Sequence, residues 1–197
     1  MVTGLIEHAI HGKGSTSKYC VVVTLDVRNA FNSVNWHLIR ESLAKIGIPA
    51  FLAAIVNSCL QERRLWYDTD DGLQEYAISA GVPQGSVLSL LLGNIMYNDI
   101  LNLNLPEEAT MVGCADGKHL EDAELYSCEA ISAVKGWLES SGLTLAKEKT
   151  EVVLITKYRK INFPRIQIEN HITTSKSAIK YLGVMIDGKL SYKQHVQ

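Results

Sequence analysis

The sequence has no excess of charge of either sign, no long apolar run and no cysteine pair at metal-binding spacing. Its net charge is −2 over 197 residues. Nucleic-acid-binding domains usually carry a basic excess, because phosphate contacts supply much of their affinity. Either the chain does not bind nucleic acid, or the basic parts of a binding domain are missing.

Two further absences bear on location. No apolar run approaches the roughly 20 residues that a membrane-spanning helix needs. The segment Met1–Lys18 has no apolar stretch of the kind found in secretory signals. We therefore expect an intracellular protein of the nucleus or cytoplasm, neither secreted nor bound to a membrane.

The cysteines Cys20, Cys59, Cys114 and Cys128 show no C-x-x-C spacing. This excludes the common zinc frameworks, and we expect small, buried, free thiols in a reducing compartment. With 47% hydrophobic and 20% charged residues, the composition is that of a globular chain. The length favours one domain with a sizeable core.

Apolar periodicity predicts an α+β fold. The β-branched run Tyr19–Leu25 predicts a buried strand that ends at Asp26. Asp70-Asp71-Gly72 between two short apolar segments predicts a β-hairpin. The other predicted elements are helices near residues 36–46, 49–60, 87–103 and 120–140, and strands near residues 110–114, 151–156, 165–168 and 180–186. Because hairpins dominate, we expect a mostly antiparallel sheet covered by helices.

Two aspartates come directly after predicted strands. Asp26 ends the first strand, where a carboxylate is costly unless it is paired or holds a cation. Asp116 comes after the strand predicted at Thr110–Cys114. Two such carboxylates could hold a pair of Mg²⁺ ions, which stabilise the attacking and leaving oxygens of a phosphoryl transfer. Taken singly, Asp26 also fits a helix cap and Asp116-Gly117 a standard turn.

The segment Ala80–Ser86 (AGVPQGS) is rich in residues that break regular structure. Its two glycines let the backbone approach a ligand, and Gln84 could then reach the edge of a base or sugar. The same segment also fits an ordinary turn before a helix that Ser86 caps.

Five segments, in this order, resemble the reverse transcriptases of non-LTR retrotransposons. LDVRNAFNSVNW resembles motif A of that family, and AGVPQGSVL with NIMYNDI resembles motif B. VGCADG stands where motif C, usually Y/F-A-D-D, belongs. WLESSGLTLAKEKTEVVLIT resembles motif D, and IKYLGVMIDGKLSYKQHV resembles motif E with the segment beyond it. The resemblance implies that residues 1–197 are a partial RNA-directed DNA polymerase domain, a palm with fingers and thumb largely missing and no endonuclease domain.

By position, the resemblance implies that Asp26, the Val27 carbonyl and Asp116 bind two catalytic Mg²⁺ or Mn²⁺ ions. Phe31 would be the gate beneath the incoming sugar, and Lys149 would stand near the departing pyrophosphate. Phe31 also fits a core position, and Lys149 a solvated turn. The implied reaction is attack of a primer 3′-hydroxyl on the α-phosphate of a nucleotide, catalysed by positioning and charge.

The resemblance also implies that Gln84 and Gly85 line the nucleotide and template pocket. Tyr181, Leu182 and Gly183 would form the turn that grips the primer end, although Tyr181 also fits ordinary strand packing. The implied partners are an RNA template, a DNA primer and deoxynucleoside triphosphates, and the sequence does not predict an oligomeric state.

The chain departs from the family pattern at motifs B and C. Gly117 replaces the second motif C aspartate and has no ligand atom, a loss that should cost several kcal/mol of transition-state stabilisation. The polar segment Lys118–Asp122 stands where a return strand belongs, so we expect that strand to be deleted. Gly93 replaces a motif B tryptophan and should loosen packing. We therefore expect a non-catalytic remnant; the alternatives are a polymerase active in a larger assembly and a nucleic-acid-binding module.

Overall fold

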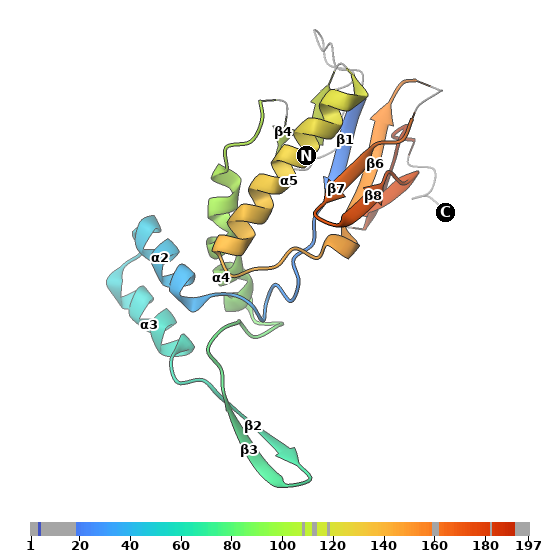
Figure 1. Cartoon of the computed structure of the whole chain (residues 1–197). Coiled ribbons are helices and arrows are strands. Elements are labelled where there is room, and N and C mark those ends of the chain that lie inside the picture. Colours follow the sequence, from blue (N-terminus) through green and yellow to red (C-terminus); the bar gives the residue numbers. More distant parts are fainter. Residues whose placement is uncertain are drawn as a thin grey trace. The chain divides into compact units, whose positions relative to one another are not determined.

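The computed structural model (Figure 1) describes Gly4 and residues 19–107, 109–111, 114–117, 119–158, 162–181 and 183–191. Contacts divide the chain into two compact units. The first unit comprises residues 1–27, 103–137 and 145–197, and the second comprises residues 28–102 and 138–144.

A four-stranded antiparallel sheet forms the centre of the first unit. Its strands, in the order β4-β5-β1-β6, are β4 (Ala109–Thr110), β5 (Cys114–Gly117), β1 (Tyr19–Thr24) and β6 (Glu151–Thr156). β1 takes a central place because its apolar side chains can be buried on both faces, and Val21 and Val22 are 0% and 2% exposed. The predicted strands at the start of motif A and in motif D are confirmed.

Helix α5 (Leu120–Ser140) has the predicted bounds, and its part in the first unit runs beside this sheet in Figure 1. Its apolar residues recur at helical spacing, so that Ala123, Ile131 and Val134 are all buried. The prediction of an α+β fold with an antiparallel sheet and a helix beside it is confirmed.

Two hairpins complete the first unit: β7 (Arg165–Ile168) with β8 (His171–Thr174), and β9 (Ala178–Tyr181) with β10 (Val184–Asp187). Side chains of β9 and β10 join β1 and β6 in one buried cluster: Cys20, Val22, Val153, Ile155, Ile179 and Ile186. The single strand predicted over residues 180–186 is a hairpin instead. Gly183, at φ 85°, adopts the left-handed conformation that turns the chain there.

The segment around Asp116 also differs from prediction. β4 ends at Thr110, and β5 returns antiparallel to it with Cys114 opposite Thr110. β5 then pairs with β1, so no strand is missing beside β1. No described residue between Gly117 and helix α5, which begins at Leu120, forms a strand, in agreement with the predicted deletion. Without a neighbour on that side, β1 would leave backbone groups unpaired, each costing about 1–3 kcal/mol if buried. The residues of the motif C turn are used as the return strand, and Asp116 lies within β5 rather than after a strand.

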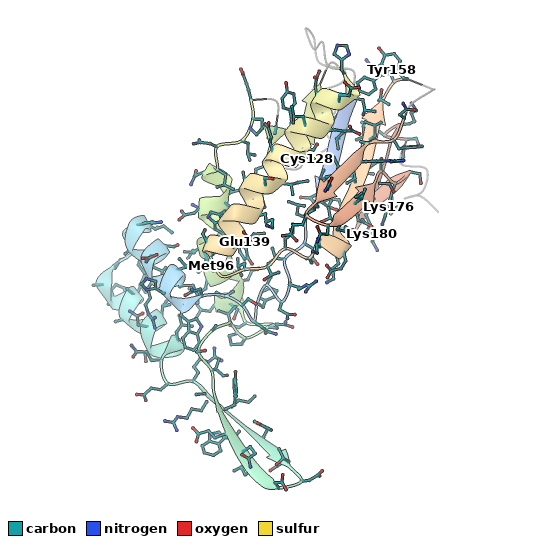
Figure 2. The ribbon with its side chains drawn as sticks, viewed as in Figure 1. Met96, Cys128, Glu139, Tyr158, Lys176 and Lys180 are labelled. Atoms are coloured by element: carbon teal, nitrogen blue, oxygen red, sulfur yellow. The ribbon has the colours of Figure 1, made fainter. Side chains whose placement is uncertain are left out.

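The cysteine prediction holds only in part. Cys59 is exposed and free, and Cys128, on α5 in Figure 2, is half-buried and free. Cys20, however, is disulfide-bonded. A cross-link between segments that are distant along the chain leaves no spacing pattern in the sequence, which is why the prediction was wrong for Cys20.

The second unit contains α2 (Trp36–Ile46), α3 (Ala50–Leu60), the ribbon β2 (Arg64–Thr69) with β3 (Gly72–Ala77), and α4 (Val87–Tyr97) with the 3₁₀ helix η1 (Asn98–Asn102) directly after it. The predicted helices are confirmed, except that the α-helix predicted to reach residue 103 ends at Tyr97.

Local signals set the bounds of α2 in this unit. The Asn35 side chain accepts a hydrogen bond from the His37 N–H (2.9 Å) at its start, and Gly47, at φ 74°, ends it. In the described part of the chain, no helix is both long and apolar enough to cross a membrane.

Candidate active site

Asp26 lies just beyond β1, where the chain bridges to the segment before β6. Its carbonyl accepts a hydrogen bond from the Ala146 N–H (2.8 Å), and Val27 forms an antiparallel bridge with Leu145. Because the hydrogen bonds flank the bridge, from Ala146 to Asp26 and from Arg28 to Thr144, Val27 and Leu145 form a non-hydrogen-bonded pair. The bridge therefore does not use the Val27 carbonyl, which was predicted to be a metal ligand.

Lys149 is brought to Asp26 by the same bridge. The short helix η2 (Lys147–Lys149) comes after Ala146, and the Lys149 N–H donates to the Ala146 carbonyl (2.9 Å). The Lys149 Nζ lies 3.1 Å from the Asp26 Oδ2, with 65% and 50% of the two side chains exposed. At that exposure the pair contributes at most about 1 kcal/mol to stability. The pair places an ammonium group directly beside the Asp26 carboxylate of the candidate site.

The third predicted catalytic residue, Asp116, is not brought to Asp26 by the sheet. In the register of β5 with β1, Asp116 lies opposite Cys20. The strand alone separates Cys20 from Thr24 by about 13 Å, and Asp26 lies further on. β5 runs away from the Asp26 end of β1, and each residue after Cys114 is more distant.

These residues do not fit a pair of Mg²⁺ or Mn²⁺ ions. Within the described ranges no group of three His, Cys, Asp or Glu side chains could hold a metal ion. Asp26 is paired with Lys149, and Gly117 contributes no ligand atom. The arrangement can hold a charge at Asp26, but it lacks the converging carboxylates that a two-metal phosphoryl transfer needs.

In the second unit, the segment Ala80–Ser86 is bonded to the turn at the end of motif A. The Gly81 N–H donates to the Val34 carbonyl (2.8 Å), and the Val82 N–H donates to the Phe31 carbonyl (2.8 Å). The Phe31 ring itself is 39% exposed, so this residue does not take the core position that its sequence also allowed.

Only glycine fits at position 81. Its φ is 86°, and a Cβ there would lie 2.8 Å from the Asn32 carbonyl oxygen, closer than real Cβ contacts. The Trp36 Nε1–H donates to the Gly81 carbonyl (2.7 Å), and this bond is buried. Gly81 therefore fixes the loop against the end of motif A.

A cavity of about 520 Å³ opens beside this loop. Its lining residues are Asn32, Arg63, Leu65, Tyr76, Ile78, Ser79, Ala80, Gly81, Val82, Pro83 and Gln84. Gln84 was predicted to line a nucleotide pocket and lines this cavity, whereas the neighbouring Gly85 is exposed and does not line it.

The predicted primer-grip turn lies in the first unit. Val184 pairs with Tyr181, so the β9–β10 hairpin closes through a two-residue turn that contains Gly183. Tyr181 packs against the buried cluster beneath the hairpin. Leu182 lies outside the described residues.

Sequence reasoning missed Arg63 and Tyr76 at the cavity. Tyr76 lies on the predicted hairpin and Arg63 comes directly before β2, and strand alternation was the signal that could have placed them on one face with Leu65. It also missed Glu169, which pairs with the Lys135 Nζ (2.8 Å) and the Lys147 Nζ (2.9 Å). Hydrogen bonds from these two ammonium groups lower the pKa of Glu169 to about 2.

Comparison with known proteins shows which family the sequence matches. The family model described as reverse transcriptase (RNA-dependent DNA polymerase) matches residues 3–186. The chain is 27% identical over 191 residues to a probable RNA-directed DNA polymerase from transposon X-element of Drosophila melanogaster, covering 92% of this chain and 21% of that protein. It is 29% identical over 192 residues to the RNA-directed DNA polymerase from mobile element jockey of the same species, covering 91% and 21%.

Among solved structures, apo telomerase from Candida tropicalis, truncated from its C-terminal domain, is similar with a TM-score of 0.64 and 15% identity, covering 98% of this chain and 38% of that one. At this identity the likeness concerns the fold. The chain spans about a fifth of the length of the curated relatives that it matches (21%).

Proposed function

The chain belongs to the reverse transcriptase (RNA-dependent DNA polymerase) family, and we propose that it is a palm that no longer extends a primer by itself. The matched relatives are polymerases of non-LTR retrotransposons. The observation that carries the proposal is the register of β5, in which Asp116 lies opposite Cys20 rather than beside Asp26.

The family's chemistry explains why this register matters. Reverse transcriptases use divalent metal ions, and the ions of a two-metal site stabilise the attacking and leaving oxygens of the in-line displacement. The carboxylates that hold these ions must therefore lie close together. Each loss of about 1.4 kcal/mol of transition-state stabilisation lowers the rate tenfold. Asp26, with Lys149 beside it, supplies only one carboxylate. We expect weak binding of Mg²⁺ or Mn²⁺ there and no measurable nucleotidyl transfer.

The other predicted roles remain part of this proposal as inherited positions. Gln84 and Gly85 would line the nucleotide and template pocket, and Phe31 would lie beneath the sugar. Tyr181 and Gly183 would contact the primer end. These residues would contact nucleotide, template and primer even if no reaction follows. The chain would act in the nucleus or cytoplasm.

Primer extension tests the proposal. The full chain is incubated with an RNA template, a DNA primer, deoxynucleoside triphosphates and either Mg²⁺ or Mn²⁺, beside the Asp26→Ala variant. We expect incorporation to equal that of the variant. Incorporation that Asp26→Ala abolishes would overturn the proposal. A cooperative thermal transition monitored by circular dichroism is the required control, since an unfolded chain would also be inactive.

A second candidate function, a nucleic-acid-binding module, is favoured by the cavity beside the Ala80–Ser86 loop and by the guanidinium of Arg63 in its wall. Its partners would be the RNA template or the DNA primer. Salt-sensitive binding of an oligonucleotide supports this function, and the absence of binding at low ionic strength rules it out.

A further inference from the structure

We infer that the base of the β2–β3 ribbon and the loop beside it form a pocket for one unpaired nucleotide of a single-stranded nucleic acid. Arg63 would contact the phosphate, and Tyr76 would stack on the base. The inference rests on the nucleic-acid-binding function proposed above, and it is independent of whether the chain extends a primer.

Strand alternation places the two residues on one face of the ribbon. Leu65 is opposite Tyr76 in the antiparallel register, and the Ile78 N–H donates to the Arg63 carbonyl (2.9 Å), which extends the pairing by one step. Because side chains alternate between faces, these four residues share a face, and all four line the cavity. Figure 2 shows side chains standing off both sides of this ribbon.

The opposite face of the ribbon is chemically different. Arg64 is ion-paired with Glu75 across the two strands. No ion pair among the described residues involves Arg63. Arg63 is also the only charged residue among those lining the cavity. The cavity wall therefore presents one positive charge that is not neutralised by a neighbouring carboxylate, and it should select an anion.

The remaining lining groups suit a nucleobase. The Tyr76 side chain is 61% exposed, so its ring is available for stacking, which tolerates any base because every base has a π-face. The Asn32 and Gln84 amides can each donate and accept hydrogen bonds at the edge of a base or sugar. A cavity of about 520 Å³ lies within the usual range of about 300–1,000 Å³ for small-ligand sites. It would admit one nucleotide that has left the stack, but not a base pair within a duplex.

The floor of the pocket is held in place before any ligand binds. The bonds of Gly81 to Val34 and of Trp36 to Gly81 fix the loop, and the Val82 side chain is buried. A preformed wall reduces the ordering that binding would otherwise require. The ribbon, in contrast, is exposed along its whole length, so its aromatic residues are accessible to a partner.

Fluorescence anisotropy with labelled oligouridine and oligothymidine of about 12 nucleotides, within the usual site sizes for single strands, tests the inference on the full chain. Tyr76→Ala should weaken binding about tenfold through lost stacking, and Tyr76→Phe should retain most of it. Arg63→Ala should weaken binding and reduce the slope of log affinity against log salt by about 0.7, the value for one phosphate contact to a single strand. A preference for oligouridine would indicate RNA as the partner, and equal affinities would indicate that base and phosphate alone are read.

The chain offers matched controls on the same ribbon. Arg64→Ala removes a neighbouring guanidinium that does not line the cavity, and Trp66→Ala removes an exposed aromatic ring that strand alternation places on the opposite face, with Arg64. Both should leave the affinity within about twofold, since neither residue would touch base or phosphate. Equal losses for Arg63→Ala and Arg64→Ala, or no loss for Tyr76→Ala, would overturn the inference, as would no binding by the wild-type chain in low salt.

Two further results keep these outcomes interpretable. If Arg63→Ala does not fold, Arg63→Lys should preserve the salt slope while weakening affinity, because lysine keeps the charge but not the planar fork. Primer extension in the presence of normal oligonucleotide binding would overturn the proposed inactivity and leave the pocket standing. Oligonucleotide binding that is unchanged in every ribbon variant would overturn the pocket and leave the proposed inactivity standing.

Discussion

At the scale of single residues, Gly81 is a position where a methyl group should be poorly tolerated. Gly81→Ala combines a left-handed φ of 86° with a Cβ 2.8 Å from the Asn32 carbonyl oxygen. The conformational strain alone costs about 1–2 kcal/mol, and the collision adds to it. We expect a lower urea midpoint in chemical unfolding, with the loop released from motif A.

Gly47→Ala is the matched control for that experiment. Gly47 also has a left-handed φ, 74°, but a Cβ there meets nothing within 4 Å. It should therefore lose only the strain term. Equal loss of stability in the two variants would show that the close approach of Gly81 to the turn after motif A contributes nothing.

The pairing of Glu169 with two lysines predicts a pH dependence of stability. The pKa of Glu169 is lowered from 4.5 to about 2, chiefly by the hydrogen bonds from Lys135 and Lys147. A carboxyl group with a depressed folded-state pKa contributes stability that is present above its unfolded value of 4.5 and is lost as the pH falls through about 2. The difference in melting temperature between wild type and Glu169→Gln should thus be greatest near neutral pH and shrink steadily at more acidic pH.

Salt supplies the control for this prediction. The Glu169 side chain is 42% exposed, so ions in solution screen the pairing. In about 1 M salt the difference between wild type and variant should diminish at every pH. A difference that is independent of pH would contradict the assignment to the charged pair.

At the scale of elements, the short strand β5 determines what one substitution can restore. Gly117→Asp would return the second motif C aspartate to the sequence. In the register of the sheet, however, Gly117 lies opposite Tyr19, one residue further from Asp26 than Asp116 is. We therefore expect no primer extension by Gly117→Asp with Mg²⁺ or Mn²⁺. Robust extension, abolished by adding Asp26→Ala, would mean that the hairpin turns at Asp116 in solution.

The same element illustrates how a sheet uses a shortened segment. An unpaired strand can pair with any nearby segment, because every residue except proline has both a main-chain donor and a main-chain acceptor. A catalytic side chain, by contrast, must lie at one particular place in the sheet. β5 satisfies the backbone of β1 and at the same time removes Asp116 from the end of the strand where Asp26 lies.

At the scale of the whole molecule, the predicted site residues divide between the two units. Asp26, Asp116 and Lys149 belong to the first, and Phe31 and Gln84 belong to the second. Each unit has a local organisation of its own: a bridge that joins motif A to motif D in the first, and a loop fixed to the turn after motif A in the second. The metal-binding positions lie in the first unit, whereas the residues that line the proposed nucleotide pocket all belong to the second.

The sequence by itself determined the elements whose signals are local, and it determined the family. The bounds of α2 follow from Asn35 and Gly47, and the apolar periodicity of residues 120–140 specifies α5, because capping and helical spacing act within a few residues. The ordered motifs were enough to identify a reverse transcriptase palm.

Only the tertiary structure decided the pairings between distant segments. These include the register of β5 on β1, the approach of Lys149 to Asp26, the disulfide at Cys20, and the face of the ribbon that lines the cavity. The physical reason is that main-chain hydrogen bonds between strands do not depend on which side chains are present. A change of register nevertheless shifts the position of every side chain on the strand. The aspartates could be found in the sequence, but their separation could not.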